Sequence, residues 1–113
     1  MSDSSHIAET PRPPYYSVIF TSLRTEVDDG YSEMAERMVH LASKQPGFLG
    51  METVREEAAS ITVSYWANEE AVMQWKSNLE HQEAQQQGRK KWYNQYKVRV
   101  AKVERDYGFS REI

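Results

Sequence analysis

The hydrophobic positions of this chain change their period several times, and each change predicts a boundary between secondary-structure elements. Tyr15 to Arg24 is aromatic and β-branched and contains neither glycine nor proline, which is typical of a strand. Apolar residues fall on both of its faces, so we expect both faces to be covered. Phe48 to Arg55 and Ile61 to Trp66 predict two more strands, joined into a hairpin by the turn Glu56 to Ser60. A further alternating segment, Tyr93 to Glu104, predicts the last strand.

Two segments with helical spacing lie between these strands. The first follows Asp28, Asp29 and Gly30 and ends before Pro46 and Gly47, so we expect an amphipathic helix with an aspartate cap. Its apolar residues recur every three or four positions, as one buried helix face requires. They are Tyr31, Met34, Met38, Leu41 and Ala42.

The second helical segment begins after Asn68, which is a good N-cap residue, and carries two glutamates in its first turn. We expect this helix to break or bend near Ser77 and Asn78, because both side chains compete for backbone hydrogen bonds. A further helical piece is predicted from about residue 80 to residue 91, weakened by Gly88.

Together these segments follow the order β-α-β-β-α-β, which is the ferredoxin-like pattern of an α+β domain with a four-stranded antiparallel sheet. The helices would cover one face of the sheet. The apolar content of the other face predicts packing against a second copy of the chain, as in a dimeric α/β barrel. We expect residues 1–14 to form a flexible arm, residues 15–107 the domain and residues 108–113 a C-terminal tail.

Composition narrows the classes of partner. The 113 residues carry a net charge of -3 and no basic stripe, so nucleic acid is not expected as a partner. The absence of cysteine excludes a disulfide framework, a thiolate nucleophile and a cysteine metal site. No apolar run approaches the roughly 20 residues of a membrane span, and the N-terminus lacks the apolar stretch of a secretory signal. We therefore expect a soluble, cytoplasmic protein with no membrane partner.

The segment from Ser64 to Tyr93 holds the residue types from which a binding site could be built. It contains every tryptophan of the chain together with one histidine, one arginine and one tyrosine of interest: Trp66, Trp75, Trp92, His81, Arg89 and Tyr93. The aromatic side chains could line a pocket, although large aromatics also form ordinary cores. His81 could accept a proton near neutral pH and Arg89 could stabilise an anion. A surface histidine and an exposed salt bridge are the simpler alternatives. The three histidines are widely separated, so no metal site is predicted.

Four local features occur together in this chain. They are the QPGFLG turn at Gln45 to Gly50, the ITVSYW strand at Ile61 to Trp66, the acidic-capped helix from Asn68 to Trp75, and His81 shortly afterwards. With the order of elements, they make the chain resemble the antibiotic biosynthesis monooxygenase superfamily over about Tyr15 to Tyr107. The resemblance implies a dimeric α/β barrel and specifies no substrate.

The resemblance implies three alternative functions. Some members of the superfamily oxygenate aromatic compounds without a metal or organic cofactor, and others are accessory dimers with no established reaction. A third branch binds and degrades haem, using an axial histidine about three helical turns after a tryptophan and an asparagine on the first strand. Trp75 fits that tryptophan, but Gln85 stands ten residues on, His81 comes earlier, and the first strand has no asparagine.

The sequence therefore predicts a cofactor-independent monooxygenase that acts on a small aromatic or quinoid compound as a homodimer. His81 and Arg89 are the predicted catalytic residues. The predicted substrate-binding residues are Trp66, Trp75, Trp92 and Tyr93. The alternatives are a non-catalytic ligand-binding or accessory dimer, and a haem-binding or haem-degrading monooxygenase in which a histidine ligates the iron.

Overall fold

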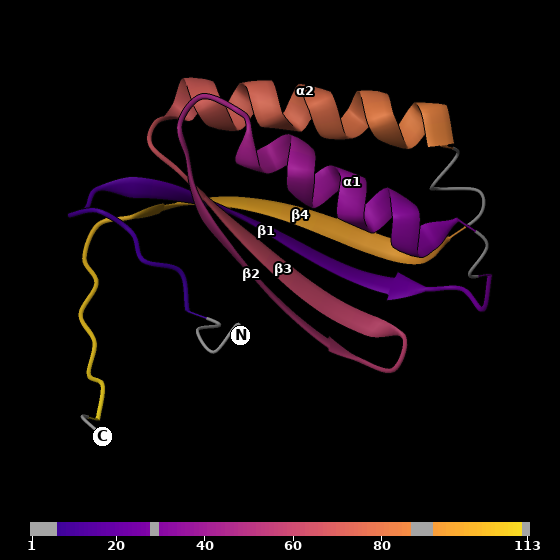
Figure 1. Ribbon diagram of the computed structural model, residues 1–113, viewed down its shortest axis with the longest axis horizontal. Coiled ribbons are helices and arrows are strands. Elements are labelled where there is room, and N and C mark those ends of the chain that lie inside the picture. Colours follow the sequence, from indigo (N-terminus) through magenta and orange to yellow (C-terminus); the bar gives the residue numbers. More distant parts are fainter. Residues whose placement is uncertain (1–6, 28–29, 87–91, 112–113) are drawn as a thin grey trace.

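The computed structural model describes residues 7–27, 30–86 and 92–111, with side chains described for residues 7–27, 30–80 and 92–111. Over these residues the strands and helices follow the order β-α-β-β-α-β (Figure 1). Their bounds are β1 Tyr15–Arg24, α1 Tyr31–Ser43, β2 Phe48–Glu56, β3 Ala59–Trp66, α2 Glu69–Gln86 and β4 Tyr93–Val103. The α+β, ferredoxin-like fold predicted from the sequence is confirmed.

The strands form one antiparallel sheet in the spatial order β2-β3-β1-β4. Both helices lie on the same face of the sheet, and α2 runs beside α1 (Figure 1). β3 and β1 are therefore central, while β2 and β4 are the edge strands. The N-terminal arm, residues 7–14, and the C-terminal segment after β4 both leave toward the opposite face (Figure 1).

Strand register sorts the side chains of the sheet into two sets, because successive residues of a strand point to opposite faces. On the face toward the helices, three rows run across the sheet in the order β2, β3, β1, β4. The first row is Arg55, Ser60, Ser22 and Tyr96; the second is Thr53, Thr62, Phe20 and Val98; the third is Met51, Ser64, Val18 and Val100. We call these twelve residues the sheet floor.

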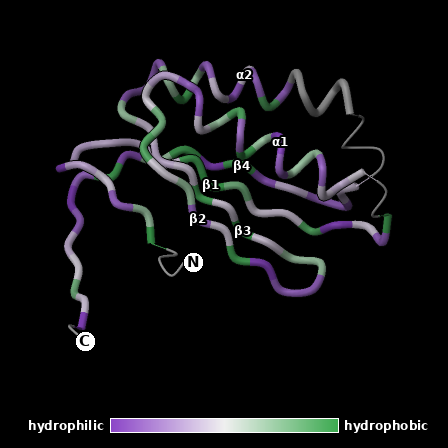
Figure 2. The backbone as a smooth tube through the Cα atoms, in the orientation of Figure 1, coloured by the Kyte–Doolittle hydropathy of each residue, from purple (hydrophilic) through white to green (hydrophobic). Residues whose placement is uncertain are grey.

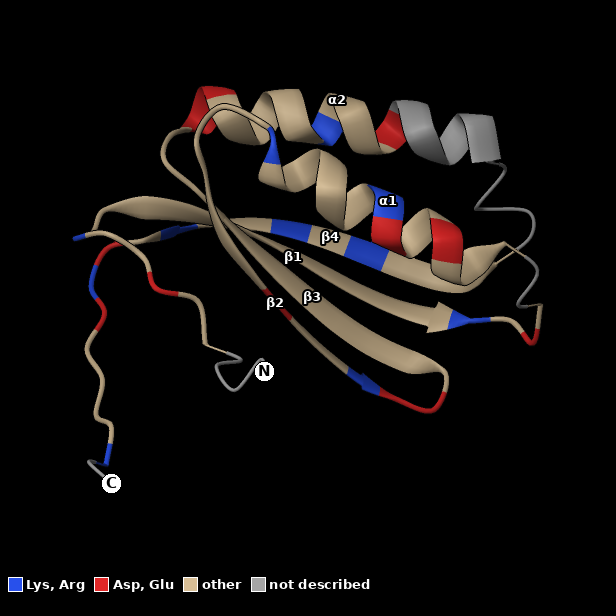
Figure 3. Ribbon diagram, in the orientation of Figure 1, with Lys and Arg blue, Asp and Glu red and all other residues tan. Residues whose placement is uncertain are grey.

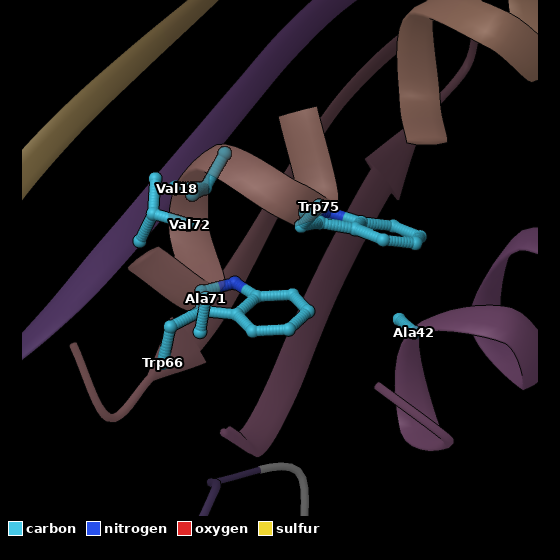
Figure 4. Close-up of a cluster of buried hydrophobic side chains, with 6 residues drawn as sticks. All are labelled: Val18, Ala42, Trp66, Ala71, Val72 and Trp75. Atoms are coloured by element: carbon cyan, nitrogen blue, oxygen red, sulfur yellow. The ribbon is translucent and has the colours of Figure 1, made fainter. Parts of the chain in front are cut away.

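The main hydrophobic core lies between the sheet and the helices, at the end of β3. Trp66 and Trp75 are both buried, and their rings stack with centroids 5.5 Å apart and planes inclined by 26°. Phe48 meets the Trp66 ring edge-on, with centroids 5.4 Å apart. Figure 4 shows the two indoles facing each other, together with the other buried residues of the core: Val18, Ala42, Ala71 and Val72. Such aromatic packing adds specific geometry to a large buried apolar area.

α1 begins differently from the sequence prediction. Its N-cap residue is Gly30, which has a φ of 80° and supplies no side-chain cap. Asp28 and Asp29 lie outside the described residues. Glycine adopts a positive φ without the steric cost that other residues meet. The Gly30 carbonyl accepts a hydrogen bond from the Met34 N–H at 3.1 Å, so glycine starts the helix through its backbone and the predicted aspartate cap is wrong.

α2 is one continuous helix, so the predicted break near Ser77 and Asn78 is wrong. The Asn78 amide donates to the carbonyl of Gln74, one turn earlier, and to Oε1 of Gln45 beyond the end of α1, both at 3.2 Å. The side chain therefore finds acceptors without displacing a backbone hydrogen bond of the helix. At the start of the helix the predicted cap is confirmed, because Asn68 Oδ1 accepts from the Ala71 N–H at 2.9 Å.

The hairpin between β2 and β3 is tighter than predicted. The strands continue to Glu56 and from Ala59, so the turn consists of Glu57 and Ala58 rather than five residues. Glu57 has a φ of 53°, a conformation that non-glycine residues adopt uncommonly.

Hydrophilic residues recur along both helices and through the segment after β4 (Figure 2). None of the helices described here is long and apolar enough to cross a membrane.

The face of the sheet away from the helices carries a network of tyrosines and carboxylates. Glu52 accepts hydrogen bonds from the Tyr65 hydroxyl at 2.7 Å and from the Ala8 N–H at 2.8 Å, which fastens the N-terminal arm to β2. The Tyr15 hydroxyl donates to Asp106, and the Tyr15 ring meets the Tyr65 ring edge-on with centroids 5.8 Å apart. This face therefore holds both terminal segments against the sheet.

Candidate functional site

A cavity of about 620 Å³ separates the sheet floor from the two helices. Every residue of the floor except Ser22 lines it, and α1 and α2 form its roof. Volumes of roughly 300 to 1,000 Å³ are typical of small-molecule sites. The cavity is therefore large enough for an aromatic ligand, which the sequence alone could not establish.

The half of the sheet floor on β2 and β3 is polar except for Met51, and the half on β1 and β4 is apolar except for Ser22. β2 and β3 supply Thr53, Arg55, Ser60, Thr62 and Ser64, whereas β1 and β4 supply Val18, Phe20, Tyr96, Val98 and Val100. Several of the hydroxyls are already paired, because Thr53 and Thr62 share a hydrogen bond of 3.1 Å and Ser22 and Ser60 share another of 3.1 Å. A flat ligand on this floor would meet hydroxyl groups along one edge and apolar side chains along the other.

The roof of the cavity is mainly apolar. α1 contributes Met34, Ala35 and Met38, and α2 contributes Val72, Trp75 and Leu79. Trp75 has two roles here, since its ring stacks on Trp66 in the core and also lines the cavity. The ring position is therefore fixed by packing, which is what a surface that orients a planar ligand requires.

One end of the cavity is built from aromatic rings. Tyr31 meets Trp92 and Tyr93 edge-on, with centroids 5.9 Å and 6.2 Å away. Phe20 stacks on Tyr96 at 5.3 Å and meets Tyr93 at 5.7 Å. All five of these residues line the cavity, and they come from β1, α1, β4 and the segment before β4. The rings support one another, so they form a rigid wall.

Ser64 is the polar residue best placed to hold a ligand atom. It is 3 % exposed, lines the cavity and accepts a hydrogen bond from the Trp66 Nε1–H at 2.8 Å. A serine hydroxyl is one donor as well as an acceptor. Its hydrogen meets no acceptor among the described residues, so a ligand oxygen above Ser64 could receive it. The Trp66 bond fixes the position of the hydroxyl oxygen.

Four charged residues line the described part of the cavity: Arg55 on β2, Glu36 on α1, and Lys76 and Glu80 on α2. Basic and acidic residues are interspersed over the elements as a whole (Figure 3). No group of three or more histidine, cysteine, aspartate or glutamate side chains that could hold a metal ion occurs among the described residues. The described lining residues include no histidine, and the side chain of His81 lies outside the described residues.

The structure places the residues predicted from the sequence in different surroundings. Trp75, Trp92 and Tyr93 line the cavity. Trp66 is fully buried behind Trp75 and reaches the cavity only through its hydrogen bond to Ser64. The other two predicted residues fall outside the description. The side chain of His81, whose backbone belongs to α2, and the whole of Arg89 lie outside the described residues.

Several lining residues were not predicted from the sequence, notably Tyr31, Tyr96, Phe20, Arg55 and Ser64. Tyr31 had been assigned only to a helix face, and the others only to strands. Strand alternation alone puts Ser64 and Trp66 on the same face of β3. What it lacked was the register, which aligns Ser64 with Val18 and Met51 beneath the helices.

Comparisons with known proteins identify the family of this chain. The family described as antibiotic biosynthesis monooxygenase matches residues 14–87. The uncharacterized protein YqjZ of Bacillus subtilis is 56 % identical over 100 residues, which cover 88 % of each chain. Among solved structures, SnoaB, a cofactor-independent oxygenase from Streptomyces nogalater, aligns with a TM-score of 0.62 at 11 % identity over 88 % of this chain and all of that one.

A second solved structure, PA3566 from Pseudomonas aeruginosa, aligns with a TM-score of 0.64 at 13 % identity, covering 86 % of this chain and 99 % of that one. At these identities the solved structures establish the shared fold and nothing about the ligand.

Proposed function

The chain belongs to the antibiotic biosynthesis monooxygenase family, and we propose that it oxygenates a small aromatic or quinoid compound in the cavity between the sheet and the helices, without a bound cofactor. The observation that carries this proposal is the cavity of about 620 Å³, with its aromatic end wall and its row of hydroxyls on one half of the floor. SnoaB, which is described as a cofactor-independent oxygenase, has the same fold and adds support.

The proposed reaction requires few chemical groups from the protein. A phenol or quinol that has lost a proton is electron-rich enough to react with oxygen directly, provided that it is oriented, kept from water and stabilised as an anion. At a ring CH2 activated by a neighbouring phenolate, O2 adds to form a hydroperoxide, which then loses water and leaves a carbonyl. The carbon loses four electrons, one oxygen atom stays in the product, and the other leaves as water. No further reductant is required.

Each part of the described cavity has a role in this reaction. Trp75 and the aromatic end wall would hold the planar ring system, and the Ser64 hydroxyl would donate to the substrate oxygen that carries the negative charge. Trp66 would act as a positioning residue, because it fixes Ser64 and does not itself line the described cavity. His81 as the proton acceptor and Arg89 as an anion stabiliser stay predictions from the sequence.

The test measures oxygen uptake by the purified protein in the presence of EDTA. The substrate offered is 1,8-dihydroxyanthrone, which has a ring CH2 activated by phenol groups. We expect uptake above the uncatalysed rate and, with labelled O2, one labelled oxygen atom in the anthraquinone product. Ser64→Ala should lower kcat/KM by about tenfold or more, since a hydrogen bond to a charged oxygen is lost.

Ser17→Ala is the matched control for this variant. Ser17 is also a buried strand serine, but it lies on the opposite face of the sheet, where its hydroxyl contacts the carbonyl of Ala101 at 3.4 Å. It should leave kcat/KM unchanged. Saturable binding of the anthrone without oxygen uptake would instead assign the protein to the non-catalytic ligand-binding class.

A further inference from the structure

Arg55 is an exposed cation on the sheet floor with no hydrogen-bond or ion-pair partner among the described residues. It lies on β2 opposite Ser60, lines the cavity, and has its guanidinium carbon 5.6 Å from the centroid of the Tyr31 ring. It makes no hydrogen bond or ion pair with any residue that the structure describes. A guanidinium offers five N–H donors, so several of them remain available to a ligand.

A comparison with Arg24 shows that Arg55 is not needed to pack Tyr31. The Arg24 guanidinium carbon lies 3.5 Å above the centroid of the Tyr31 ring, and Arg24 Nη2 donates to the carbonyl of Val27 at 3.2 Å. Arg24 therefore supplies the close cation–π contact. Arg55 stands farther from the same ring and faces the cavity, which Arg24 does not line.

Among the described residues, Arg55 forms no ion pair with either carboxylate that lines the cavity, Glu36 or Glu80. Glu36, Lys76 and Glu80 come from the helices, and Lys76 and Glu80 are four residues apart on α2, a spacing at which opposite charges offset each other. On the sheet floor, Arg55 is the sole charged residue among those described. The polar half of the floor therefore ends in an isolated positive charge.

We infer that the cavity selects aromatic ligands that carry a carboxylate, and that Arg55 is the residue that binds it. The planar guanidinium matches a carboxylate with two parallel N–H···O bonds, and the pairing is strengthened by full charge on both partners. The inference rests on the proposed function for the reaction that follows binding, but the binding itself can be measured alone.

Register sets the length of this ligand. Arg55 lies opposite Ser60, which is four residues from Ser64 along β3, or about 13 Å at the usual rise of a strand. The carboxylate would thus bind at one end of the floor, and the reacting oxygen would lie over Ser64 toward the other end. An elongated molecule of two or three fused rings with an acidic group at one end fits this arrangement.

The test compares two ligands of nearly equal shape, 2-naphthoate and 2-naphthalenemethanol, by isothermal titration calorimetry at pH 7. The carboxyl group is ionised at this pH and the alcohol is neutral. We expect the wild type to bind the naphthoate at least about tenfold more tightly, since a hydrogen-bonded charge pair is involved. Arg55→Met should bring the ratio of the two Kd values close to one, and Arg55→Lys should leave an intermediate ratio, because the charge stays and the planar fork is lost.

Arg99→Met is the matched control, because Arg99 lies on β4 opposite Ile19, on the face away from the helices. It should leave the ratio unchanged, and thermal melts should show all three variants folded. A ratio near one in the wild type, an undiminished ratio in Arg55→Met, or no binding of either ligand would each overturn the inference.

The outcomes separate this inference from the proposed reaction. Selective binding of the naphthoate through Arg55, without oxygen uptake on any anthrone, would leave the carboxylate selection standing and remove the oxygenase function. Oxygen uptake on the neutral anthrone, with no preference of the wild type for naphthoate, would support the oxygenase function and overturn the carboxylate selection.

Discussion

The indole N–H of Trp66 donates to the hydroxyl of Ser64 at 2.8 Å, and this bond joins the hydrophobic core to the cavity. Trp66 is fully buried and stacks on Trp75, so its position is set by packing on several sides. The hydrogen bond therefore holds the Ser64 hydroxyl in a fixed position. Fold stability and the orientation of the cavity hydroxyl are therefore coupled through one side chain.

Replacing Trp66 tests its contribution to the core. Trp66→Ala should lower the free energy of unfolding by about 3–5 kcal/mol, since it removes a buried indole and leaves a void. Trp66→Phe keeps a ring but removes the N–H, and should cost less. Urea unfolding followed by circular dichroism measures both. Met73→Ala on α2 is the control, because Met73 is 69 % exposed and should change stability by no more than about 0.5 kcal/mol. Equal effects of Trp66→Ala and Met73→Ala would contradict the core assignment.

Among the described glycines, Gly47 is the one at which an added methyl group is least tolerated. Its φ is 86°, and a Cβ there would lie 2.7 Å from Cβ of Ala71 on α2. Gly47→Ala should therefore destabilise the protein by about 1–3 kcal/mol, through backbone strain and overpacking. Thermal denaturation measures the loss. Gly108→Ala is the control and should have little effect, because a methyl group added at Gly108 would meet no atom within 4 Å.

A second substitution separates the two causes of strain at Gly47. Adding Ala71→Gly to Gly47→Ala removes the methyl that would clash, but leaves the positive φ. The double variant should lose less stability than the sum of the losses in the two single variants, because the clash is gone. It should still be less stable than Ala71→Gly alone, because the positive φ remains. Full additivity would mean that the clash contributes nothing.

The tyrosines on the face away from the helices predict a loss of stability at alkaline pH. Burial, together with the hydrogen bond to Glu52, raises the pKa of Tyr65 above its usual value of 10.0. Burial and the hydrogen bond to Asp106 likewise raise the pKa of Tyr15. Below pH 10 the phenols are protonated in both the folded and the unfolded state, so the stabilisation that the two tyrosines give the folded state is fully present. Above pH 10 the unfolded chain loses its phenolic protons first, and stability falls as pH rises.

Urea midpoints between pH 8 and pH 11 measure this decline. Tyr65→Phe should flatten it, because the ionisable group is gone from both states. Tyr107→Phe is the matched control, since Tyr107 is fully exposed, and should leave the slope unchanged. An identical slope in wild type and Tyr65→Phe would show that Tyr65 does not contribute.

The catalytic role predicted for His81 has its own test. If His81 accepts the substrate proton, His81→Ala should lower kcat/KM on the anthrone by about 100-fold or more and abolish the rise of the rate between pH 5 and pH 8. His40→Ala is the control, because His40 is exposed on α1. Unchanged turnover in His81→Ala would remove the histidine from the mechanism while leaving Ser64 and Trp75 in place.

The strands were predicted well because their signals are local. β1 has the predicted bounds, since an aromatic and β-branched run without glycine or proline has few alternatives. The continuity of α2, by contrast, involves a distant partner. Asn78 keeps α2 unbroken partly through Gln45, which is 33 residues away in sequence, and no local rule includes that contact.

The cavity was harder to predict than the fold for a related reason. Trp75, Trp92 and Tyr93 were identified by residue type alone, because large aromatics are conspicuous in a sequence. Ser64 and Arg55 are ordinary strand residues until register places them under the helices. Trp66 was chosen as a pocket wall, yet the same bulk placed it in the core.

The division of the sheet floor has a consequence for redesign. Val18, Val72 and Trp75 are core residues as well as cavity walls, so changing them to admit another ligand would also weaken the domain. Thr53 and Arg55 lie exposed on the edge strand β2, and neither belongs to the core cluster. Substitutions on β2 can therefore alter ligand preference with little loss of stability. A library of variants confined to the cavity-lining positions of β2 is the most direct way to change which ligands the cavity accepts.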